Sequence, residues 1–265
     1  MNNHAMKIIY QPKGAAGEYA KYAVNFLVGC SYRCKYCYNN KGITAKALGG
    51  NPRWVQGKND YNFLDLVHQF EDDIKNNLDV LRKDGVFFSF TSDPLQDEWS
   101  QATYCALDVC EKYNIPATVL TKNGYIIRKE LMMNLFRKLI KKRLLTFGIT
   151  LTGRSLIEEP YAPPEYERMI AITKLREMDA KTFVSFEPVI NFNATLGWLL
   201  EVAPIIDEAR IGLLTPVKMS RHPAADLFKF YDRVNSLAKD MQFSVMWKKS
   251  FMDLYQRYKE PTSNQ

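Results

Sequence analysis

The sequence predicts an α/β protein, a partial (β/α)6 barrel of the TIM type with a C-terminal helical extension. Short apolar segments alternate with amphipathic segments about six times in one series. Nearly every apolar segment runs into polar residues, the last of them Thr215 and Lys218. Such alternation indicates a parallel sheet covered by helices and joined by right-handed crossovers. In barrels of this type, chemistry gathers at the carboxyl ends of the strands.

The expected elements follow one another with few long connections. Apolar runs of strand length predict strands at residues 23–28, 86–90, 117–120, 145–151, 182–186, 209–214 and 243–246. Apolar residues spaced by three or four predict helices at 62–84, 100–113, 126–142, 164–178, 194–202, 223–239 and 248–258. Gly85 ends the first helix, and Pro164 opens the fourth, where its missing N–H costs little. We expect one domain over 1–265, with its core at about 20–246 and a terminal helix at about 248–260.

Composition limits the class of protein. The 265 residues are 46% hydrophobic and 25% charged, which allows a sizeable core. The sequence contains no run of 18 apolar residues, so a membrane span is not expected. The first residues lack the pattern of a secretory signal. The net charge of +7 permits nucleic acid as a partner without requiring it. The basic run at 137–143 fits the solvated face of a helix.

Three of the five cysteines lie within eight residues, at Cys30, Cys34 and Cys37. Their clustering indicates a metal and a reducing compartment rather than disulfides, so we expect a cytoplasmic protein. Zinc needs a fourth ligand, and no other cysteine or histidine stands at finger-like spacing. Three thiolates can instead hold a [4Fe–4S] cluster and leave its fourth iron open. The alternatives are a non-catalytic zinc or nucleic-acid-binding protein and an iron–sulfur electron carrier.

The motif Cys30-x3-Cys34-x-Tyr36-Cys37, just after the first expected strand, resembles the radical S-adenosylmethionine superfamily. The segments 88–94, 119–122, 147–150 and 184–189, at successive strand ends, are similar to the branch that contains spore photoproduct lyase and its photolyase-like relatives. The resemblance covers roughly residues 6–220. It implies an enzyme that cleaves S-adenosylmethionine reductively at a [4Fe–4S] cluster and forms a 5′-deoxyadenosyl radical, which abstracts hydrogen from a substrate. It also implies an electron donor such as flavodoxin or ferredoxin.

The resemblance assigns the three cysteines to the cluster and implies contacts with S-adenosylmethionine at Tyr36, Ser92, Asp93, Lys122, Thr150 and Glu187. Ser92 and Asp93 would meet the methionine amino group, because a carboxylate accepts hydrogen bonds from an ammonium. Lys122 would pair with the methionine carboxylate, and the hydroxyl of Thr150 would assist. Tyr36 would pack near the adenine, and Glu187 would lie on the adenosine side without an assigned role. Without the cysteines, Asp93 and Lys122 fit ordinary turns equally well.

One position departs from the lyase pattern. Phe90 stands where those lyases have a cysteine that donates a hydrogen atom, and a phenyl ring cannot do so. Cys105 and Cys110 fit buried apolar positions of a helix. Tyr38 is the candidate catalytic residue, because its phenol can relay a hydrogen atom. The loop at 39–59 is long enough for a lid or a substrate contact. Nucleic acid, peptides and small molecules all remain candidate substrates.

Overall fold

The computed structural model describes residues 6–55, 63–214 and 223–260. Within them, the main sheet has eight strands in the order β1-β2-β5-β6-β7-β8-β9-β10. Only β1 and β2 are antiparallel, and all other neighbours are parallel. The strands are β1 (Ile9–Tyr10), β2 (Ala23–Val24), β5 (Val86–Phe88), β6 (Ala117–Thr121), β7 (Leu145–Thr150), β8 (Lys181–Val189), β9 (Glu208–Leu213) and β10 (Ser244–Trp247).

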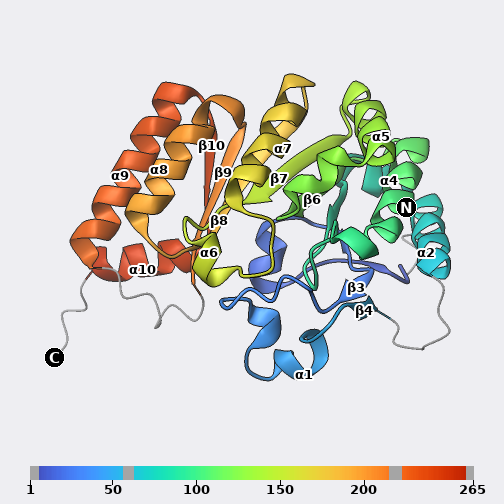
Figure 1. Cartoon of the computed structure of the whole chain (residues 1–265), viewed down its shortest axis with the longest axis horizontal. Coiled ribbons are helices and arrows are strands. Elements are labelled where there is room, and N and C mark those ends of the chain that lie inside the picture. Colours follow the sequence, from blue (N-terminus) through green and yellow to red (C-terminus); the bar gives the residue numbers. More distant parts are fainter. Residues whose placement is uncertain (1–5, 56–62, 215–222, 261–265) are drawn as a thin grey trace.

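Helices follow the strands around the sheet, from α2 to α9 (Figure 1). The larger ones are α2 (Phe63–Asn76), α3 (Leu78–Asp84), α4 (Gln101–Tyr113), α5 (Glu130–Lys141), α7 (Glu165–Glu177), α8 (Phe192–Val202), α9 (Ala224–Met241) and α10 (Lys249–Lys259). Two are short, α1 (Thr44–Leu48) and α6 (Ser155–Glu158). The core lies between the strands and their helices, with fully buried phenylalanines such as Phe136 and Phe147 meeting edge to face.

The sheet is open, because β1 and β10 lie at its two ends in the described part of the chain. The predicted partial barrel of parallel strands is therefore confirmed, and residues 244–247 add a seventh parallel strand to the six expected units. The two ends of the sheet are bridged by the 3₁₀ helix η1 (Gly14–Glu18) and α10, since Lys248 donates from Nζ to the carbonyl of Ala15 at 3.0 Å. Thr215 and Lys218 lie outside the described residues.

The prediction of one strand over 23–28 is wrong. The strand is divided into β2 and β3 (Leu27–Val28), and β3 pairs with β4 (Arg53–Trp54) in a separate two-stranded sheet. Asn25 causes the division, because its side chain donates to the Tyr10 hydroxyl at 2.8 Å and accepts from the Phe90 amide at 2.8 Å. The chain therefore leaves the main sheet directly before the cysteines.

The prediction of one helix over 62–84 is also wrong, because the helix breaks at Asn77. This residue has φ −137° and ψ 32°, and its side-chain amide donates to the carbonyl of Asp73 at 3.0 Å. A side chain that takes over a helical carbonyl competes with the next backbone N–H. The apolar spacing continues across the break, which is why periodicity alone missed it.

Other boundaries shift by a few residues. The strand expected at 86–90 ends at Phe88, and the helix expected at 126–142 begins at Glu130 after the 3₁₀ helix η4 (Gly124–Arg128). The short elements β1, β4, α1 and α6 were not predicted. Within the described residues, no helix combines the length and apolar character that crossing a bilayer requires.

Candidate active site

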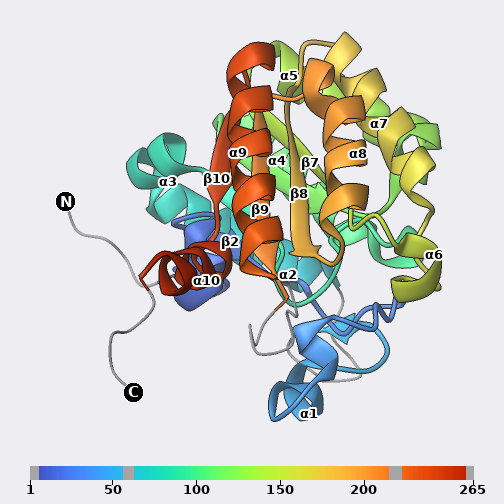
Figure 2. The same cartoon turned by 90° about the vertical axis from the view of Figure 1, so that its left-hand side faces the viewer.

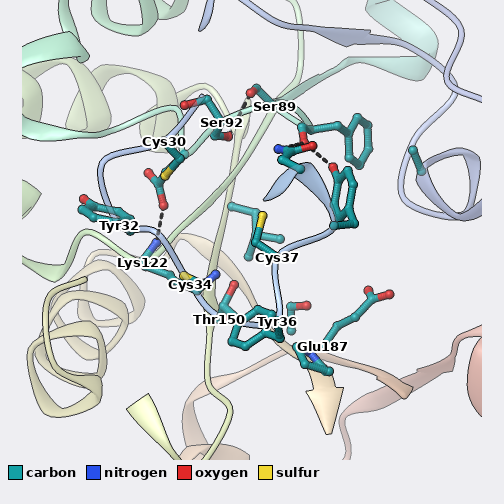
Figure 3. Close-up of a pocket in the computed structure, with 18 of the residues that line it drawn as sticks. Cys30, Tyr32, Cys34, Tyr36, Cys37, Ser89, Ser92, Lys122, Thr150 and Glu187 are labelled. Carbon is teal, nitrogen blue, oxygen red and sulfur yellow. Dashed lines mark hydrogen bonds between the residues drawn. The ribbon is translucent and has the colours of Figure 1, made fainter. Parts of the chain in front are cut away.

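A cavity of about 460 Å³ lies at the carboxyl ends of the parallel strands. Its wall is formed by the cysteine loop, by the segments that follow β5, β6 and β7, by β8 and by η1. All ten residues singled out from the sequence line it: Cys30, Cys34, Cys37, Tyr36, Tyr38, Ser92, Asp93, Lys122, Thr150 and Glu187. Figure 3 labels all of them except Tyr38 and Asp93. These side chains come from five segments of the chain, and the fold brings all of them to one space.

The cysteine loop turns sharply at Gly29. This residue has φ +84°, and a Cβ atom there would lie 2.4 Å from the carbonyl oxygen of Asn51. Only glycine fits such a conformation at so close an approach. The amide of Cys30 then donates to the carbonyl of Gly50 at 3.2 Å, which fixes where the first thiol enters the cavity.

Gln96 holds this loop against the segment after β5. Its side-chain oxygen accepts from the amide and the hydroxyl of Ser31, both at 2.7 Å. Its nitrogen donates to the hydroxyl of Ser92 at 2.5 Å and to the carbonyl of Asp93 at 3.2 Å. Gln96 is almost fully buried, and its bond to the Ser92 hydroxyl is shielded from water, whereas Ser31 lies at the exposed end of the network. Sequence reasoning missed this residue, because nothing in its local pattern indicates a partner 65 residues away.

All five cysteines are free thiols, and Cys30, Cys34 and Cys37 surround one part of the cavity (Figure 3). Burial raises the pKa of Cys30 to about 12, with a further contribution from Asp93. Burial also raises the pKa of Cys34, although Lys122 opposes that shift. A bound metal has to displace these protons, because thiolates are the ligand form.

The donor set fits an iron–sulfur cluster. Within the described residues, no three Cys, His, Asp or Glu side chains are gathered closely enough to hold a single metal ion. The three thiols border a space instead, as ligands to three different irons must. Tyr32 lines the same cavity, and its buried hydroxyl has no hydrogen-bond partner among the described residues.

Asp93 ties two strand ends together. Its carboxylate accepts from the hydroxyl of Thr121 and the amide of Lys122, both at 2.7 Å, and from the amide of Leu95 at 3.0 Å. Burial raises the pKa of Asp93, and these three donors oppose the shift. Three of the four lone-pair positions of the carboxylate are thereby used within the protein. Asp93 therefore shapes the site whether or not it also contacts a ligand.

Lys122 carries an unpaired ammonium at the cavity. Among the described residues, no hydrogen-bond acceptor or carboxylate lies within reach of its Nζ, which sits 5.6 Å from the ring centre of Tyr36. Burial lowers the pKa of Lys122, but the nearby Cys34 and Glu159 outweigh it, so the pKa is raised. The side chain stays a cation without a partner, ready to pair with an anion.

The ring of Tyr36 is fixed from behind. Its hydroxyl donates to Glu159, which is ion-paired with Arg168, and both members of this pair are fully buried. Arg168 also donates to the carbonyls of Thr150 at 2.8 Å and Pro163 at 2.7 Å. The guanidinium links the end of β7 to the tyrosine beside Cys37. Glu159 and Arg168 were missed, because a single charged residue in a sequence does not reveal a buried partner.

Tyr38 and Phe90 meet at the mouth of the cavity. The phenol of Tyr38 donates to the backbone carbonyl of Phe90, and about half of the Tyr38 side chain is exposed. The ring of Phe90 stacks on Phe87, with centroids 4.5 Å apart, and meets Tyr19 edge to face at 6.0 Å. The position of the missing lyase cysteine is thus filled by a packed aromatic ring.

The end of the cavity away from the cysteines is polar and charged. Tyr19 donates to Glu187 at 2.6 Å and lies 2.8 Å from the hydroxyl of Ser185. The buried ammonium of Lys248 lies 3.9 Å from the ring centre of Tyr19. Burial raises the pKa of Glu187 and lowers that of Lys248, while each charge opposes the shift of the other. Tyr19 and Lys248, which no motif indicated, make this a second polar pole.

Comparison with known proteins gives the fold. No family model matches the chain. Spore photoproduct lyase in complex with dinucleoside spore photoproduct superposes with a TM-score of 0.65 and 14% identity, covering 90% of this chain and 80% of that one. A spore photoproduct lyase mutant with bound S-adenosylmethionine and dinucleoside spore photoproduct gives 0.63 and 14%, over 86% and 76% of the two chains. The chain therefore has the fold of spore photoproduct lyase.

Two further similarities span less of the related protein. Streptococcus suis SuiB bound to its precursor peptide SuiA gives a TM-score of 0.59 and 13% identity, over 88% of this chain and 50% of SuiB. The uncharacterized protein MJ0683 of Methanocaldococcus jannaschii is 26% identical over 178 residues, 64% of this chain and 61% of that protein. The chain thus matches about half of SuiB and about three fifths of its curated relative. The expected likeness to spore photoproduct lyase is confirmed at the level of the fold.

Proposed function

We propose that this protein is a radical S-adenosylmethionine enzyme that abstracts a hydrogen atom from its substrate. The observation that carries the proposal is the shared cavity, which three free thiols and all six residues expected to contact S-adenosylmethionine line together. Cys30, Cys34 and Cys37 would hold a [4Fe–4S] cluster. With S-adenosylmethionine bound, this cluster supplies a 5′-deoxyadenosyl radical, which side chains alone cannot generate. The radical S-adenosylmethionine fold supports this chemistry.

The chain's own residues would orient the bound S-adenosylmethionine. Lys122, the unpaired ammonium, would pair with the methionine carboxylate, and Ser92 and Asp93 would receive the amino group. Asp93 keeps one lone-pair position for that contact beyond its three protein donors. Tyr36 would pack against the adenine, held in place by Glu159. Thr150 would contribute its hydroxyl from the end of β7.

Glu187 would lie on the adenosine side, where its Oε1, which has no hydrogen-bond donor among the described residues, could accept a hydrogen bond from a ribose hydroxyl. Only Oε2 is used by Tyr19. Tyr38 would act as the catalytic residue that relays a hydrogen atom, and its position at the cavity mouth supports that role. The phenol would exchange its bond to the Phe90 carbonyl for one to the reacting group.

The substrate is proposed to be a nucleic acid, on the fold shared with spore photoproduct lyase, which was solved with a dinucleoside lesion. SuiB was solved with a peptide, so a peptide is the competing class. Phe90 argues against the lyase reaction itself, because the hydrogen-donating cysteine is missing. We also propose that residues 1–265 form one domain, that the protein works in the cytoplasm, and that flavodoxin or ferredoxin supplies the electron.

Anaerobic reconstitution with iron and sulfide tests the proposal. About four irons and four sulfides per chain are expected, and dithionite should then drive formation of 5′-deoxyadenosine. Deuterated oligonucleotides and peptides should be compared, since the true substrate class passes deuterium to 5′-deoxyadenosine. A preparation that binds one zinc and no sulfide would overturn the proposal in favour of a zinc or nucleic-acid-binding protein.

A further inference from the structure

The outer side of the cysteine loop carries an exposed apolar cluster. Leu156 is 88% exposed, Ile157 50% and Tyr161 65%, all in or just after α6. Tyr166 and Ile170 on α7, at 57% and 50%, lie one helical turn apart on the same exposed side. Single exposed apolar residues are common, but Leu156, Ile157 and Tyr161 in one short segment that contacts the cysteine loop indicate a protein contact surface.

The exposed apolar cluster contacts the cysteine loop directly. The amide of Lys35 donates to the carbonyl of Glu158 at 2.8 Å, and the guanidinium of Arg33 lies 6.0 Å from the ring centre of Tyr161. Arg33 and Lys35 flank Cys34 in sequence, and both are exposed whereas Cys34 is buried. The exposed surface therefore directly adjoins Cys34, a candidate ligand of the iron–sulfur cluster.

The charged side chains around the exposed apolar cluster are mostly positive. Arg33, Lys35 and Arg154 are exposed, and none of them has a carboxylate partner among the described residues. Glu158 is the one acidic side chain at the surface of α6, and it is half-buried. The sequence from 19 to 59, which contains the cysteine loop, has seven basic residues and no Asp or Glu. Such a surface attracts an acidic partner.

We propose that the face formed by Arg33, Lys35, Arg154, Leu156, Ile157 and Tyr161, the carrier face, docks a small acidic one-electron carrier protein. The inference rests on the proposed function, because only a reducible cluster behind Cys34 gives the carrier something to reduce. In this step one electron passes from the reduced carrier to the oxidised cluster, and no atom is transferred. The apolar residues supply the contact core, and the basic residues supply the rim that steers encounter.

Two other occupants fit less well. A nucleic acid would need the basic residues but would leave the three exposed apolar side chains of the carrier face without a partner. A second copy would place the same basic residues against themselves across a two-fold axis. An acidic protein with an apolar patch satisfies both halves of the face. Figure 2 shows α6 at the right-hand side, well below α5 at the upper end of the molecule, so a control site away from this face is available on α5.

The test compares two double variants of the reconstituted enzyme. Arg154→Glu/Leu156→Glu alters the carrier face without touching the cysteine loop or the cavity. Leu131→Glu/Lys141→Glu makes the same chemical change on α5, where Leu131 is 71% exposed. Binding to flavodoxin is measured by biolayer interferometry at low and high salt, and 5′-deoxyadenosine formation is measured with flavodoxin and, separately, with dithionite.

The carrier-face variant should bind flavodoxin about tenfold more weakly and lose salt dependence, while the dithionite-driven rate stays unchanged. The α5 variant should match the wild type in both. The proposal would be overturned if both variants bound flavodoxin as tightly as the wild type, or if both lost binding equally. It would also be overturned if the carrier-face variant kept its binding to flavodoxin but bound single-stranded DNA more weakly in the same assay. Absence of any dithionite-driven cleavage in the wild type would instead refute the enzyme function, and the binding comparison would still decide the docking face.

Discussion

Gln96 and Ser31 form a two-point contact in which one side-chain oxygen accepts from both the amide and the hydroxyl of Ser31, each at 2.7 Å. Ser31 directly follows the first cysteine, and Gln96 lies in the segment between β5 and α4. The cysteine loop has no helix or long strand of its own, so this contact replaces the regular structure that would otherwise hold it. Four predictions follow from such contacts and from the charges around the site.

Gln96→Ala should destabilise the protein and loosen the cysteine loop together. Removing the side chain leaves the buried hydroxyl of Ser92 without its donor and releases the exposed Ser31 from the segment after β5, which costs about 1–3 kcal/mol in the free energy of unfolding. Urea denaturation should detect the loss, and iron bound after reconstitution should fall below that of the wild type. Gln101→Ala, at an exposed position that opens α4, is the matched control and should change neither quantity.

Gly29→Ala should prevent the loop from reaching its native conformation. The new methyl group would lie 2.4 Å from the carbonyl oxygen of Asn51, at a φ that alanine also disfavours. We expect a loss of about 2–4 kcal/mol in the free energy of unfolding, from strain and overpacking together. Gly42→Ala separates the two causes, because Gly42 also has positive φ but has open space around it. It should cost only about 1 kcal/mol, so equal losses would refute the steric explanation.

Lys122→Met should weaken binding of S-adenosylmethionine without weakening the fold. The lost charge-assisted bond predicts an affinity about 10- to 100-fold lower by calorimetry on the reconstituted enzyme, with iron content unchanged. The free energy of unfolding should stay level or rise, because a buried ammonium without an acceptor is itself unfavourable. Lys21→Met, which removes a largely exposed lysine paired with Asp84, serves as the control for charge alone. A fall in stability equal to the fall in affinity would mean that Lys122 is structural.

The free energy of unfolding at low pH should depend on Glu71. Hydrogen bonds from Lys112 and Tyr113 hold the pKa of Glu71 at about 2 in the folded chain. A lowered folded-state pKa stabilises the protein above the unfolded pKa of about 4.5, and this contribution is lost as the pH falls from about 4.5 to about 2. Glu71→Gln should therefore cost about 1 kcal/mol at pH 7, because Lys112 is largely exposed and screened, and nothing at pH 2.

Unfolding by urea at several pH values measures that difference. Asp72→Asn, one residue along α2, is the control, since its half-exposed carboxylate lies 4.0 Å from Lys75. Its effect should be small and nearly constant over the same range. A pH-independent effect of Glu71→Gln would show that the charge of Glu71 does not contribute.

The sequence predicted those structural features that depend on a repeated pattern or on residues close together along the chain. The alternation of strands and helices gave the parallel sheet, and the spacing of Cys30, Cys34 and Cys37 pointed to a site that the fold gathers into one cavity. Local breaks were missed where one side chain overrides a continuous apolar pattern. Asn25 and Asn77 do this by hydrogen bonding to backbone groups, and such bonds leave no periodic trace.

The supports of the site were missed for a different reason. Gln96, Glu159 and Arg168 act through partners that are distant in sequence or buried, and their neighbours carry no motif. The position of a residue at the end of a strand predicts that its side chain faces the cavity. It does not predict which buried side chains hydrogen bond to the cavity-lining residues and fix their orientation. The sequence pattern did not indicate Tyr19, because η1 precedes the first parallel strand and lies outside the series of alternating strands and helices.

The bond from Lys248 to the carbonyl of Ala15 joins positions 233 residues apart, and the amide of Lys249 bonds Glu18 beside it. The segment η1, which lines one wall of the cavity, is therefore held by residues near the end of the described chain. The cysteine loop and η1 emerge early from the ribosome, but η1 receives these two contacts only after residue 249 has been added.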